Sequence, residues 1–288
     1  MSSIRVVVHQ MAPALADPET NARRIRSMVR DAGDADVALF PELALTGYAL
    51  GHRAREMGVA VGSEAPIPLP DGGPVAVYGL VERGEDHLTY NSAVATRGAS
   101  TLALHRKVYL PTYGTFDEGR IFARSRSSLR PFTLAPGWRA GILVCEDFWH
   151  PSLAYLLALQ EADVLLVLAA APGRGVAAEE TLPATGARGF ASTESWELIA
   201  RTTARVHALY VVLCNRVGVE DGVTFAGGSL VVDPSGTVVA RAPEGEEAVI
   251  ECTLEREEIA AARQPYSHLR DDDPAVTLHT LQRILEER

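Results

Sequence analysis

A short apolar strand that ends in a cysteine is the feature that most constrains this chain. Residues 142–144 form an apolar run typical of a buried strand, and Cys145 follows where the sequence turns polar. Pro151 then opens an amphipathic segment at 152–162, as a proline in a first helical turn can. A thiol on a strand-to-helix turn is rigid and reachable, and the backbone N–H groups beyond it favour negative charge. Because free cysteine is also among the most buried residue types, this stretch alone leaves a core cysteine as an equal alternative.

The bulk composition is ordinary for a folded globular protein. With 288 residues, 47% of them hydrophobic and 22% charged, the chain can bury a sizeable core in one large domain or two. The formal charge of −10 argues against a nucleic-acid partner, and the sequence has no cluster of lysine and arginine that could contact a phosphate backbone. No apolar stretch of about eighteen residues occurs, so we expect neither a transmembrane helix nor a membrane partner.

Cysteine and histidine usage bears on compartment and cofactors. Three cysteines, at positions 145, 214 and 252, show no CxxC or other paired spacing, which suits a reducing cytoplasm and disfavours disulfides or a zinc site. The N-terminus lacks a charged-then-apolar signal pattern. The eight histidines offer no HxxxH or HExxH helix face for a metal. We therefore expect one soluble cytoplasmic domain without a metal or another cofactor.

Strands and helices alternate along the chain in a pattern typical of an α/β fold. A strand at 4–9, a helix that begins near Asp17 and a buried strand at 37–40 form a βαβ-like opening. Turn residues predict two hairpins, which argue against an all-parallel sheet: 90–96 with 101–105, and 230–233 with 237–240. Periodicity predicts the remaining strands and helices at 75–81, 138–144, 163–168, 209–213 and 248–253, and at 52–58, 152–162, 196–207 and 255–263.

Three residues with reactive side chains stand directly after predicted strands, namely Glu42, Lys107 and Cys145. In layered α/β folds, strand ends are where sites assemble. Each residue also has an ordinary explanation, since Glu42 could cap a helix, Lys107 could be a solvated charge, and Cys145 could be core. The stiff, apolar approach through Pro41 indicates a partly buried Glu42 carboxylate, with a raised pKa that suits a base. A lysine in the same pocket would have to pair with that carboxylate.

Three segments, in order, resemble the signature segments of the nitrilase superfamily of carbon–nitrogen hydrolases: residues 40–48 (FPELALTGY), 105–111 (HRKVYLP) and 144–149 (VCEDFW). The similarity covers nearly the whole chain, because further stretches agree at 90–93, 214–218 and 227–229. The segment 116–118 with Arg120 and Phe122 is most similar to the glutamine-hydrolysing domain of glutamine-dependent NAD synthetases. No synthetase domain is expected in this chain, whose last residue is Arg288.

The resemblance implies an α/β fold of four layers, an αββα sandwich of the nitrilase type with two mixed sheets. It implies a Glu–Lys–Cys triad in which Glu42 takes the thiol proton and Cys145 attacks an amide carbon. Lys107 and the backbone N–H after Cys145 would then stabilise the oxyanion. Glu118 matches the family's second glutamate, which holds the lysine or the substrate; its alternative is an exposed acid in a loop. The family commonly pairs subunits, which implies a homodimer or a higher homo-oligomer.

Seven further residues near the motifs are candidates for the substrate pocket. The aromatic side chains suit a small amide, and the two alanines stand at the end of the strand predicted at 163–168, which follows the helix after Cys145. They are Tyr48, Tyr113, Phe116, Glu146, Trp149, Ala170 and Ala171. The loop 171–192 is long enough to be functional, and its charged candidates for an amino-acid head group are Arg174, Glu179, Glu180 and Arg188. A Cys–His dyad also stays open, with His105 or His150.

These residues favour an enzyme that hydrolyses the C–N bond of a small carboxamide and releases ammonia. Three alternatives stay open: a glutaminase subunit that supplies ammonia to a synthetase, a nitrilase or N-carbamoyl hydrolase, and a non-catalytic binding module. We assign residues 1–264 to the hydrolase domain. Residues 265–288 form a C-terminal tail with an apolar stripe that could pack on the same or a partner subunit, at Leu278, Leu281 and Ile284.

Overall fold

The strands of this chain form two six-stranded sheets and one two-stranded hairpin within residues 2–114, 116–175, 190–265 and 268–287, which the computed structural model describes. The first sheet has the order β14 (Ala248–Glu255), β1 (Ser3–Gln10), β2 (Val37–Leu39), β3 (Val75–Arg83), β4 (Thr89–Arg97) and β5 (Ser100–Arg106). The second has the order β13 (Val238–Arg241), β12 (Leu230–Val232), β9 (Tyr210–Asn215), β8 (Val164–Ala169), β7 (Trp138–Val144) and β6 (Phe132–Ala135). The hairpin consists of β10 (Val217–Glu220) and β11 (Val223–Ala226).

Both sheets are mixed, as the sequence predicts. In the first sheet β1, β2 and β3 are parallel, and β14, β4 and β5 run antiparallel to their neighbours. In the second sheet β7, β8 and β9 are parallel, and the outer strands are antiparallel. These three parallel strands read as nearly unbroken apolar runs because both of their faces are covered. The expected hairpins are confirmed as β4–β5 and β12–β13.

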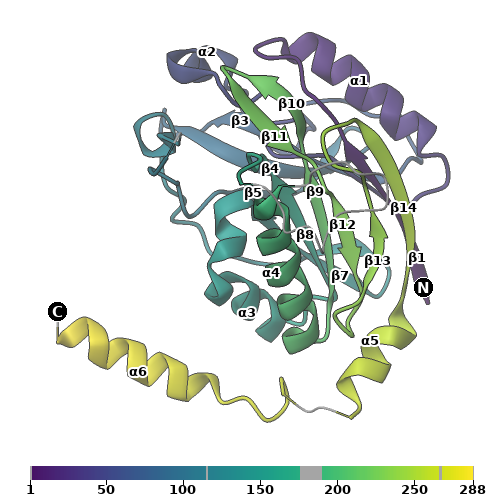
Figure 1. Cartoon of the computed structure of the whole chain (residues 1–288), viewed down its shortest axis with the longest axis vertical. Coiled ribbons are helices and arrows are strands. Elements are labelled where there is room, and N and C mark those ends of the chain that lie inside the picture. Colours follow the sequence, from purple (N-terminus) through teal and green to yellow (C-terminus); the bar gives the residue numbers. More distant parts are fainter. Residues whose placement is uncertain (1, 115, 176–189, 266–267, 288) are drawn as a thin grey trace.

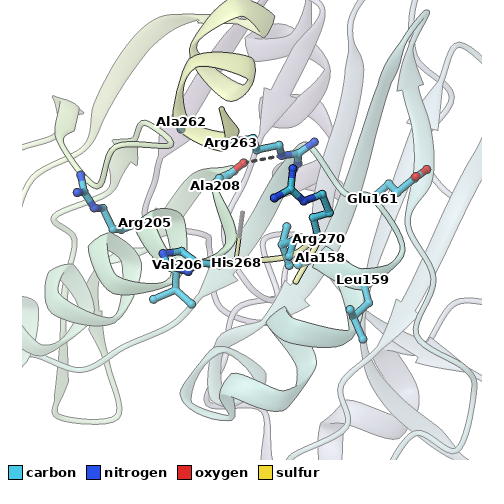
Figure 2. Close-up of a pocket in the computed structure, with 11 residues that line it drawn as sticks. Ala158, Leu159, Glu161, Arg205, Val206, Ala208, Ala262, Arg263, His268 and Arg270 are labelled. Carbon is cyan, nitrogen blue, oxygen red and sulfur yellow. Dashed lines mark hydrogen bonds between the residues drawn. The ribbon is translucent and has the colours of Figure 1, made fainter. Parts of the chain in front are cut away.

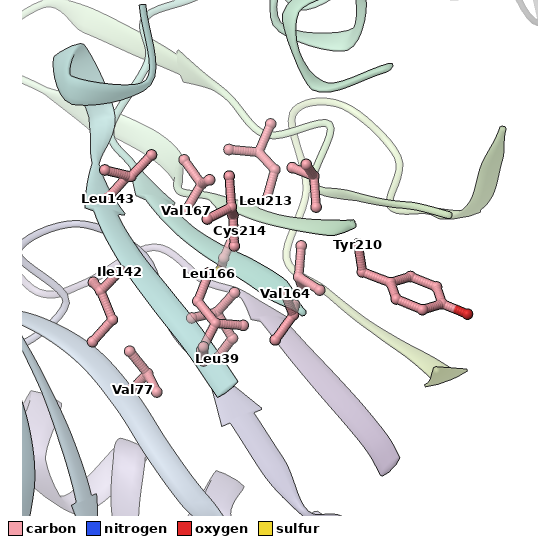
Figure 3. Close-up of a cluster of buried hydrophobic side chains, with 14 of the residues drawn as sticks. Leu39, Val77, Ile142, Leu143, Val164, Leu166, Val167, Tyr210, Leu213 and Cys214 are labelled. Atoms are coloured by element: carbon pink, nitrogen blue, oxygen red, sulfur yellow. The ribbon is translucent and has the colours of Figure 1, made fainter. Parts of the chain in front are cut away.

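The two sheets face each other across the main hydrophobic core. Leu39 and Val77 of the first sheet belong to one buried cluster with Ile142 and Leu166 of the second. Figure 3 shows these side chains between the strands. Removing this apolar surface from water is the dominant favourable term in folding. The core therefore fixes the two sheets against each other, and with them the residues that stand at the strand ends.

Helices cover the outer face of each sheet (Figure 1). On the first sheet, α1 (Pro18–Asp31) buries Ile25 and Val29, and its N-terminus is capped by Asp17, which accepts a hydrogen bond from the N–H of Thr20 at 3.0 Å. On the second sheet lie α3 (Pro151–Leu159) and α4 (Ala191–His207). Two shorter helices are α2 (Ala54–Met57) and α5 (Arg256–Arg263). The four layers confirm the predicted αββα sandwich.

The C-terminal helix α6 (Pro274–Glu286) lies away from the two sheets (Figure 1). Its predicted stripe Leu278, Leu281 and Ile284 is 59%, 52% and 40% exposed, and Leu285 beside it is 69% exposed. Just before the helix, the carboxylate of Asp272 accepts a hydrogen bond of 2.5 Å from Tyr155 of α3, so the tail is tied to the domain there. The apolar stripe predicted from the sequence thus lies on a helix and faces solvent.

Several segments differ from the expectations. Strand β6 and the hairpin β10–β11 were not expected, because their strands have four residues each and two glycines interrupt the hairpin region. The helix expected at 52–58 is limited to α2, with a 3-10 turn at Gly51–Arg53 before it. Helix α4 begins at Ala191, inside the expected loop 171–192. Three charged residues expected in that loop lie outside the described residues: Glu179, Glu180 and Arg188.

A cavity of about 340 Å³ lies at the end of the second sheet where β8 begins, whereas Cys145 follows the other end of β7. The cavity is lined by the C-terminal ends of α3, α4 and α5 and by residues 268–270 (Figure 2). There Arg263 donates hydrogen bonds to the carbonyls of Ala208 and Ala162, at 3.3 and 3.4 Å. None of the candidate site residues lines this cavity, so it is separate from the strand ends that carry them.

Candidate active site

Glu42, Lys107 and Glu118 form a buried ionic cluster. Lys107 Nζ lies 2.7 Å from Glu42 Oε1 and 2.8 Å from Glu118 Oε1. Their side chains are between 0% and 3% exposed. Lys107 directly follows β5, Glu42 follows β2, and Glu118 begins a 3-10 turn at Glu118–Arg120. The structure therefore brings together three residues that the sequence singles out separately.

The carboxylate of Glu42 has one oxygen fixed and one available. Oε1 accepts hydrogen bonds from Lys107 and from the side-chain amide of Asn91, at 2.7 and 2.8 Å, while Oε2 has no partner among the described residues. The turn after Glu42 passes so close to β3 that a Cβ at Gly79 would lie 2.2 Å from the nitrogen of Leu43. The glycine therefore permits the approach that places this carboxylate.

Cys145 directly follows β7 and begins a 3-10 helix, Cys145–Trp149. Its φ of +48° lies in the left-handed region that non-glycine residues rarely adopt, and its side chain is buried. Burial, and then the charge of Glu42, raise the pKa of the thiol well above its usual value, while Lys107 and the N–H of Ala170 oppose the shift. The resting group is therefore the neutral thiol, and a base must take its proton when it reacts.

Lys107 of the cluster stays protonated at neutral pH, whereas Glu118 has a pKa near neutrality. Burial alone lowers the pKa of Lys107, but the carboxylates of Glu118 and Glu42 outweigh it and hold that pKa well above its usual value. Burial raises the pKa of Glu118 to about 6, against the opposing effect of Lys107. The hydroxyl of Tyr48 donates a hydrogen bond of 2.5 Å to Glu118 Oε1, the oxygen that also binds the lysine.

Asp147 joins the cysteine segment to the lysine segment, and the sequence analysis missed it. This fully buried carboxylate accepts hydrogen bonds from the N–H groups of Val108 and Tyr109, both at 2.9 Å, and from Val144 N–H at 3.2 Å. His105 Nε2 lies 2.8 Å from Asp147 Oδ2, the oxygen that accepts from Val144, whereas Val108 and Tyr109 bind Oδ1. An acid that stands between a candidate nucleophile and two aromatic residues is the one sequence signal that could have indicated it.

Four candidate pocket residues lie together. Tyr113 donates a hydrogen bond of 2.7 Å to Glu146, and the ring of Phe116 meets those of Tyr113 and Tyr48 edge to face, at 5.8 and 6.0 Å between centroids. The guanidinium of Arg174 lies over Phe116, 5.4 Å from the centroid. Phe116 contacts Tyr48, whose hydroxyl binds Glu118, so this group of aromatic and charged side chains adjoins the ionic cluster.

The remaining pocket candidates contribute differently. Trp149 makes an edge contact with Trp196 of α4 at 5.6 Å and is partly exposed. Ala170 and Ala171 are buried at the end of β8. The backbone N–H of Ala170 lowers the pKa of the Cys145 thiol, and the N–H of Ala171 donates to Asn215 Oδ1 at 2.9 Å. The two alanines therefore act through their backbone rather than through their side chains.

Both histidines near the site are engaged by other groups. His105 pairs with Asp147, and His150 stacks on Tyr109 with 3.4 Å between ring centroids. Glu42 is therefore the better candidate for the base. Across the described residues, no group of three or more His, Cys, Asp or Glu side chains is arranged to hold a metal. Over the same residues, no helix is both long and apolar enough to cross a bilayer.

The chain is similar over most of its length to known carbon-nitrogen hydrolases and their relatives. Residues 5–264 match the family model of carbon-nitrogen hydrolases. A glutamine-dependent NAD(+) synthetase from Acinetobacter baylyi is 27% identical over 99% of this chain and 49% of its own length, so this chain spans about half of that relative. A probable nitrilase from Schizosaccharomyces pombe is 27% identical over 91% of this chain and 93% of its own. The structure of an amidase of the nitrilase superfamily from Nesterenkonia has a TM-score of 0.72 and 20% identity, and the match covers 97% of this chain and 98% of that one.

Proposed function

The chain belongs to the carbon–nitrogen hydrolase family, and from this premise we propose that it hydrolyses the C–N bond of a small carboxamide and releases ammonia. The observation that carries the proposal is the pairing of buried Lys107 with Glu42 and Glu118 beside Cys145. Buried charges are costly and persist where they are paired, and perturbed groups gather at functional sites. A thiol, a base and a cation together suit acyl transfer through sulfur.

In the first half of the proposed reaction, Cys145 is acylated. Glu42 Oε2 takes the Sγ proton as sulfur bonds to the amide carbon, and the amide oxygen becomes negative. Lys107 Nζ and the N–H of Glu146 stabilise that oxyanion. Glu42 then gives the proton to the leaving nitrogen, the C–N bond breaks, ammonia departs and a thioester remains.

In the second half, water releases the acid. Glu42, again ionised, takes a proton from water as the oxygen attacks the thioester carbon. The oxyanion forms at the same place and is stabilised by the same donors. The C–S bond then breaks, and the proton returns from Glu42 to Cys145. Glu118 keeps Lys107 oriented in both halves through its contact of 2.8 Å.

A substrate panel with ammonia detection tests this proposal. It should contain aliphatic carboxamides, nitriles and N-carbamoyl compounds, with the wild type, Cys145→Ala and the control Cys252→Ala. We expect turnover of a carboxamide by the wild type and the control, loss of turnover in Cys145→Ala, and a thioester adduct at Cys145 by mass spectrometry. Ammonia release that survives in Cys145→Ala contradicts the mechanism. Turnover of nitriles or carbamoyl compounds alone contradicts the substrate class, and no turnover at all favours a binding module.

Glutamine hydrolysis is a second candidate, in which the chain supplies ammonia to a synthetase. The resemblance of segment 116–118 and the synthetase relative support it. The acidic Glu146 and the basic Arg174 both adjoin the aromatic pair Tyr113 and Phe116, and an amino-acid head group carries both charges. Glutamine should then exceed propionamide in kcat/KM by more than about tenfold, a difference of about 1.4 kcal/mol. Equal values would favour the simple amidase.

We also propose that the chain forms a homodimer in which α6 packs against a second copy. An amphipathic helix gains stability by burying its apolar face, and here Leu278, Leu281 and Leu285 are exposed. The family resemblance, which implies paired subunits, supports a second copy as the partner. Light scattering in solution should give the mass of a dimer, and a monomer at micromolar concentration would contradict this assignment.

A further inference from the structure

The segment that leads into hairpin β10–β11 carries a buried ion pair that the triad mechanism does not use. Arg216 stands directly before β10 and Glu220 ends it, with side chains 1% and 4% exposed. Arg216 Nη2 lies 2.5 Å from Glu220 Oε1, and the guanidinium lies 4.2 Å from the centroid of Phe225. Buried ion pairs are a weak source of stability compared with apolar residues of similar volume. The contacts of this pair indicate a different role.

Glu220 holds the turn that carries Tyr48. Its Oε2 accepts hydrogen bonds from the N–H groups of Tyr48 and Ala49, at 2.8 and 2.9 Å. The ring of Phe225 packs against that of Tyr48 with 5.8 Å between centroids. A Cβ at Gly47 would lie 2.9 Å from Glu220 Oε1, so glycine permits this close approach. Bonds to an ionised acceptor are among the stronger hydrogen bonds, so Glu220 fixes the turn firmly.

From Tyr48 the contacts continue to the catalytic lysine. The Tyr48 hydroxyl donates to Glu118 Oε1 at 2.5 Å, and the same oxygen accepts from Lys107 Nζ at 2.8 Å. Lys107 in turn binds Glu42 at 2.7 Å. A shift of the Tyr48 turn would therefore move the groups that orient Lys107.

The hairpin also fixes the other side of the site. The N–H of Gly173 donates to Thr224 at 2.9 Å, and that of Ala226 donates to Ala171 at 3.1 Å. The N–H of Arg216 itself donates to the carbonyl of Ala169 at 3.1 Å. These bonds flank Ala170, whose backbone N–H favours the thiolate form of Cys145. One short hairpin thus contacts both walls of the candidate site.

We propose that Arg216 and Glu220 are a positioning pair, which sets the orientation of Lys107 through Tyr48 and Glu118. Arg216 balances and orients the buried charge of Glu220, and Glu220 fixes the turn that aims the Tyr48 hydroxyl. This inference rests on the proposed function, since it concerns the same site.

Amide hydrolysis by Tyr48→Phe, Glu220→Gln and the double variant tests the pair. Tyr48→Phe removes one hydrogen bond to a charged acceptor and should lower kcat about tenfold. Glu220→Gln should also lower kcat about tenfold, with KM changed by less than about threefold, because a misplaced group affects the chemical step. If Glu220 acts through Tyr48, the double variant is also slowed only about tenfold. A double variant slowed about 100-fold has independent effects and overturns the inference.

The pH profile adds a readout that loss of stability would not move. The groups facing Glu118 are Lys107, Glu42 and Tyr48, and the Tyr48 hydrogen bond lowers the pKa of Glu118. Tyr48→Phe should therefore move the acid limb of kcat to higher pH, and Glu220→Gln should move it in the same direction. A limb that moves in Tyr48→Phe but not in Glu220→Gln overturns the inference.

Asp163→Asn is the matched control. Asp163 is also a buried carboxylate that pairs with an arginine, Arg256, at 3.3 Å and accepts a backbone N–H, that of Arg139, at 2.9 Å. It lies just before β8, at the end of the second sheet away from Cys145. The variant should change thermal stability but neither kcat nor the acid limb. If it slows kcat as much as Glu220→Gln does, the effect is a general one and the inference fails.

Two measurements keep this test separate from the proposed function. If the wild type turns over no amide, the proposed function fails. The rate at which iodoacetamide alkylates Cys145, followed by peptide mass, then replaces turnover as the measurement. Equal slowing in Tyr48→Phe and Glu220→Gln then supports the pair, and a wild-type rate in Glu220→Gln overturns it. If Glu220→Gln does not fold because Arg216 is left unpaired, Arg216→Met/Glu220→Gln takes its place.

Discussion

The ionic cluster and helix α6 depart in opposite ways from the usual distribution of side chains. Lys107 and Glu42 have fully buried charged side chains, whereas Leu278 and Leu285 of α6 are 59% and 69% exposed. Charged residues are almost never fully buried unless paired, and an amphipathic helix normally lays its apolar face on a core. Both departures point to function, the first to chemistry and the second to association.

The two regions also differ in what they need from outside. Each charge of the cluster has a partner in the chain itself, since Lys107 binds both Glu42 and Glu118. Helix α6 buries none of its residues. The cluster should therefore respond to changes within the chain, whereas α6 should respond to protein concentration.

Removing the positive charge of Lys107 should have the largest effect on the ionic cluster. Lys107→Met should lower kcat/KM about 10³-fold because the proposed oxyanion donor is lost, and two carboxylates stay buried without their cation. Ammonia release and thermal unfolding would be measured together. The control is Arg106→Met, whose guanidinium pairs with Glu82 at 2.6 Å outside the cluster. Equal losses in both variants would show that Lys107 has no special role.

Neutralising Glu118 tests whether the cluster needs its second acid. Since its pKa is about 6, the carboxylate becomes protonated as the pH falls through that value, and Lys107 then loses a charged partner. The wild-type kcat should therefore fall below pH 6. Glu118→Gln should lower kcat by about 10- to 100-fold at pH 7.5 and remove that limb. A limb near pH 6 that survives in Glu118→Gln belongs to another group.

A charge on α6 tests the outward-facing region. Leu281→Glu should raise the dissociation constant of the proposed dimer about 100-fold, because an apolar side chain of the proposed interface becomes an unpaired charge. The control Gln282→Glu adds the same charge at the next position of the helix and should leave association nearly unchanged. Sedimentation across a concentration series measures both. Equal masses for the wild type and Leu281→Glu would remove α6 from the interface.

His9 sharpens the comparison, because it is a buried titratable group without a hydrogen-bond partner among the described residues. It stacks on Phe40 at 4.7 Å, and burial lowers its pKa to about 4. The folded state therefore disfavours the protonated ring. Above pH 6.5, the ordinary pKa of histidine, His9 is neutral in both states and costs no stability. As the pH falls from 6.5 towards 4, the free energy of unfolding decreases, by about 2 kcal/mol at pH 5.

His9→Phe should remove this loss. We take the free energy of unfolding of each protein at pH 7.5 as its own reference. On going from pH 7.5 to pH 5, the variant should lose about 2 kcal/mol less of this free energy than the wild type does. Urea unfolding at both pH values measures the difference. The exposed His52→Phe is the control and should follow the wild type. A variant as acid-sensitive as the wild type would exclude His9 as the cause.

The positions of the catalytic candidates could be predicted because each follows an apolar run that is recognisable without the fold. Glu42 and Cys145 come after short buried strands, and Lys107 comes after a hairpin strand. Asp147 could not be found in this way. Two of its partners are backbone N–H groups 39 and 38 residues away along the chain, and backbone donors leave no mark on the sequence.

The hairpin β10–β11 could not be predicted for a different reason. Its strands have four residues each, and glycines at 218 and 222 resemble a loop. Arg216 and Glu220 look like surface charges in the sequence, because such residues are seldom buried. The layers of the fold follow from apolar periodicity, whereas these polar contacts depend on which strand ends meet in space.

Cys145 has a left-handed backbone, with φ of +48°, although the proposed reaction requires a side chain at this position. Glycine adopts this angle freely, whereas another residue gives up about 1 kcal/mol there. Cys145→Gly would relax this angle but also lose a buried side chain and the proposed nucleophile, so the packing of the thiol offsets the strain of its backbone. Leu43, with φ of +49°, is also fully buried and places a second strained residue next to Glu42. Backbone strain at these two positions is therefore maintained by the core around them, and substitutions in that core should disturb the candidate site before they unfold the chain.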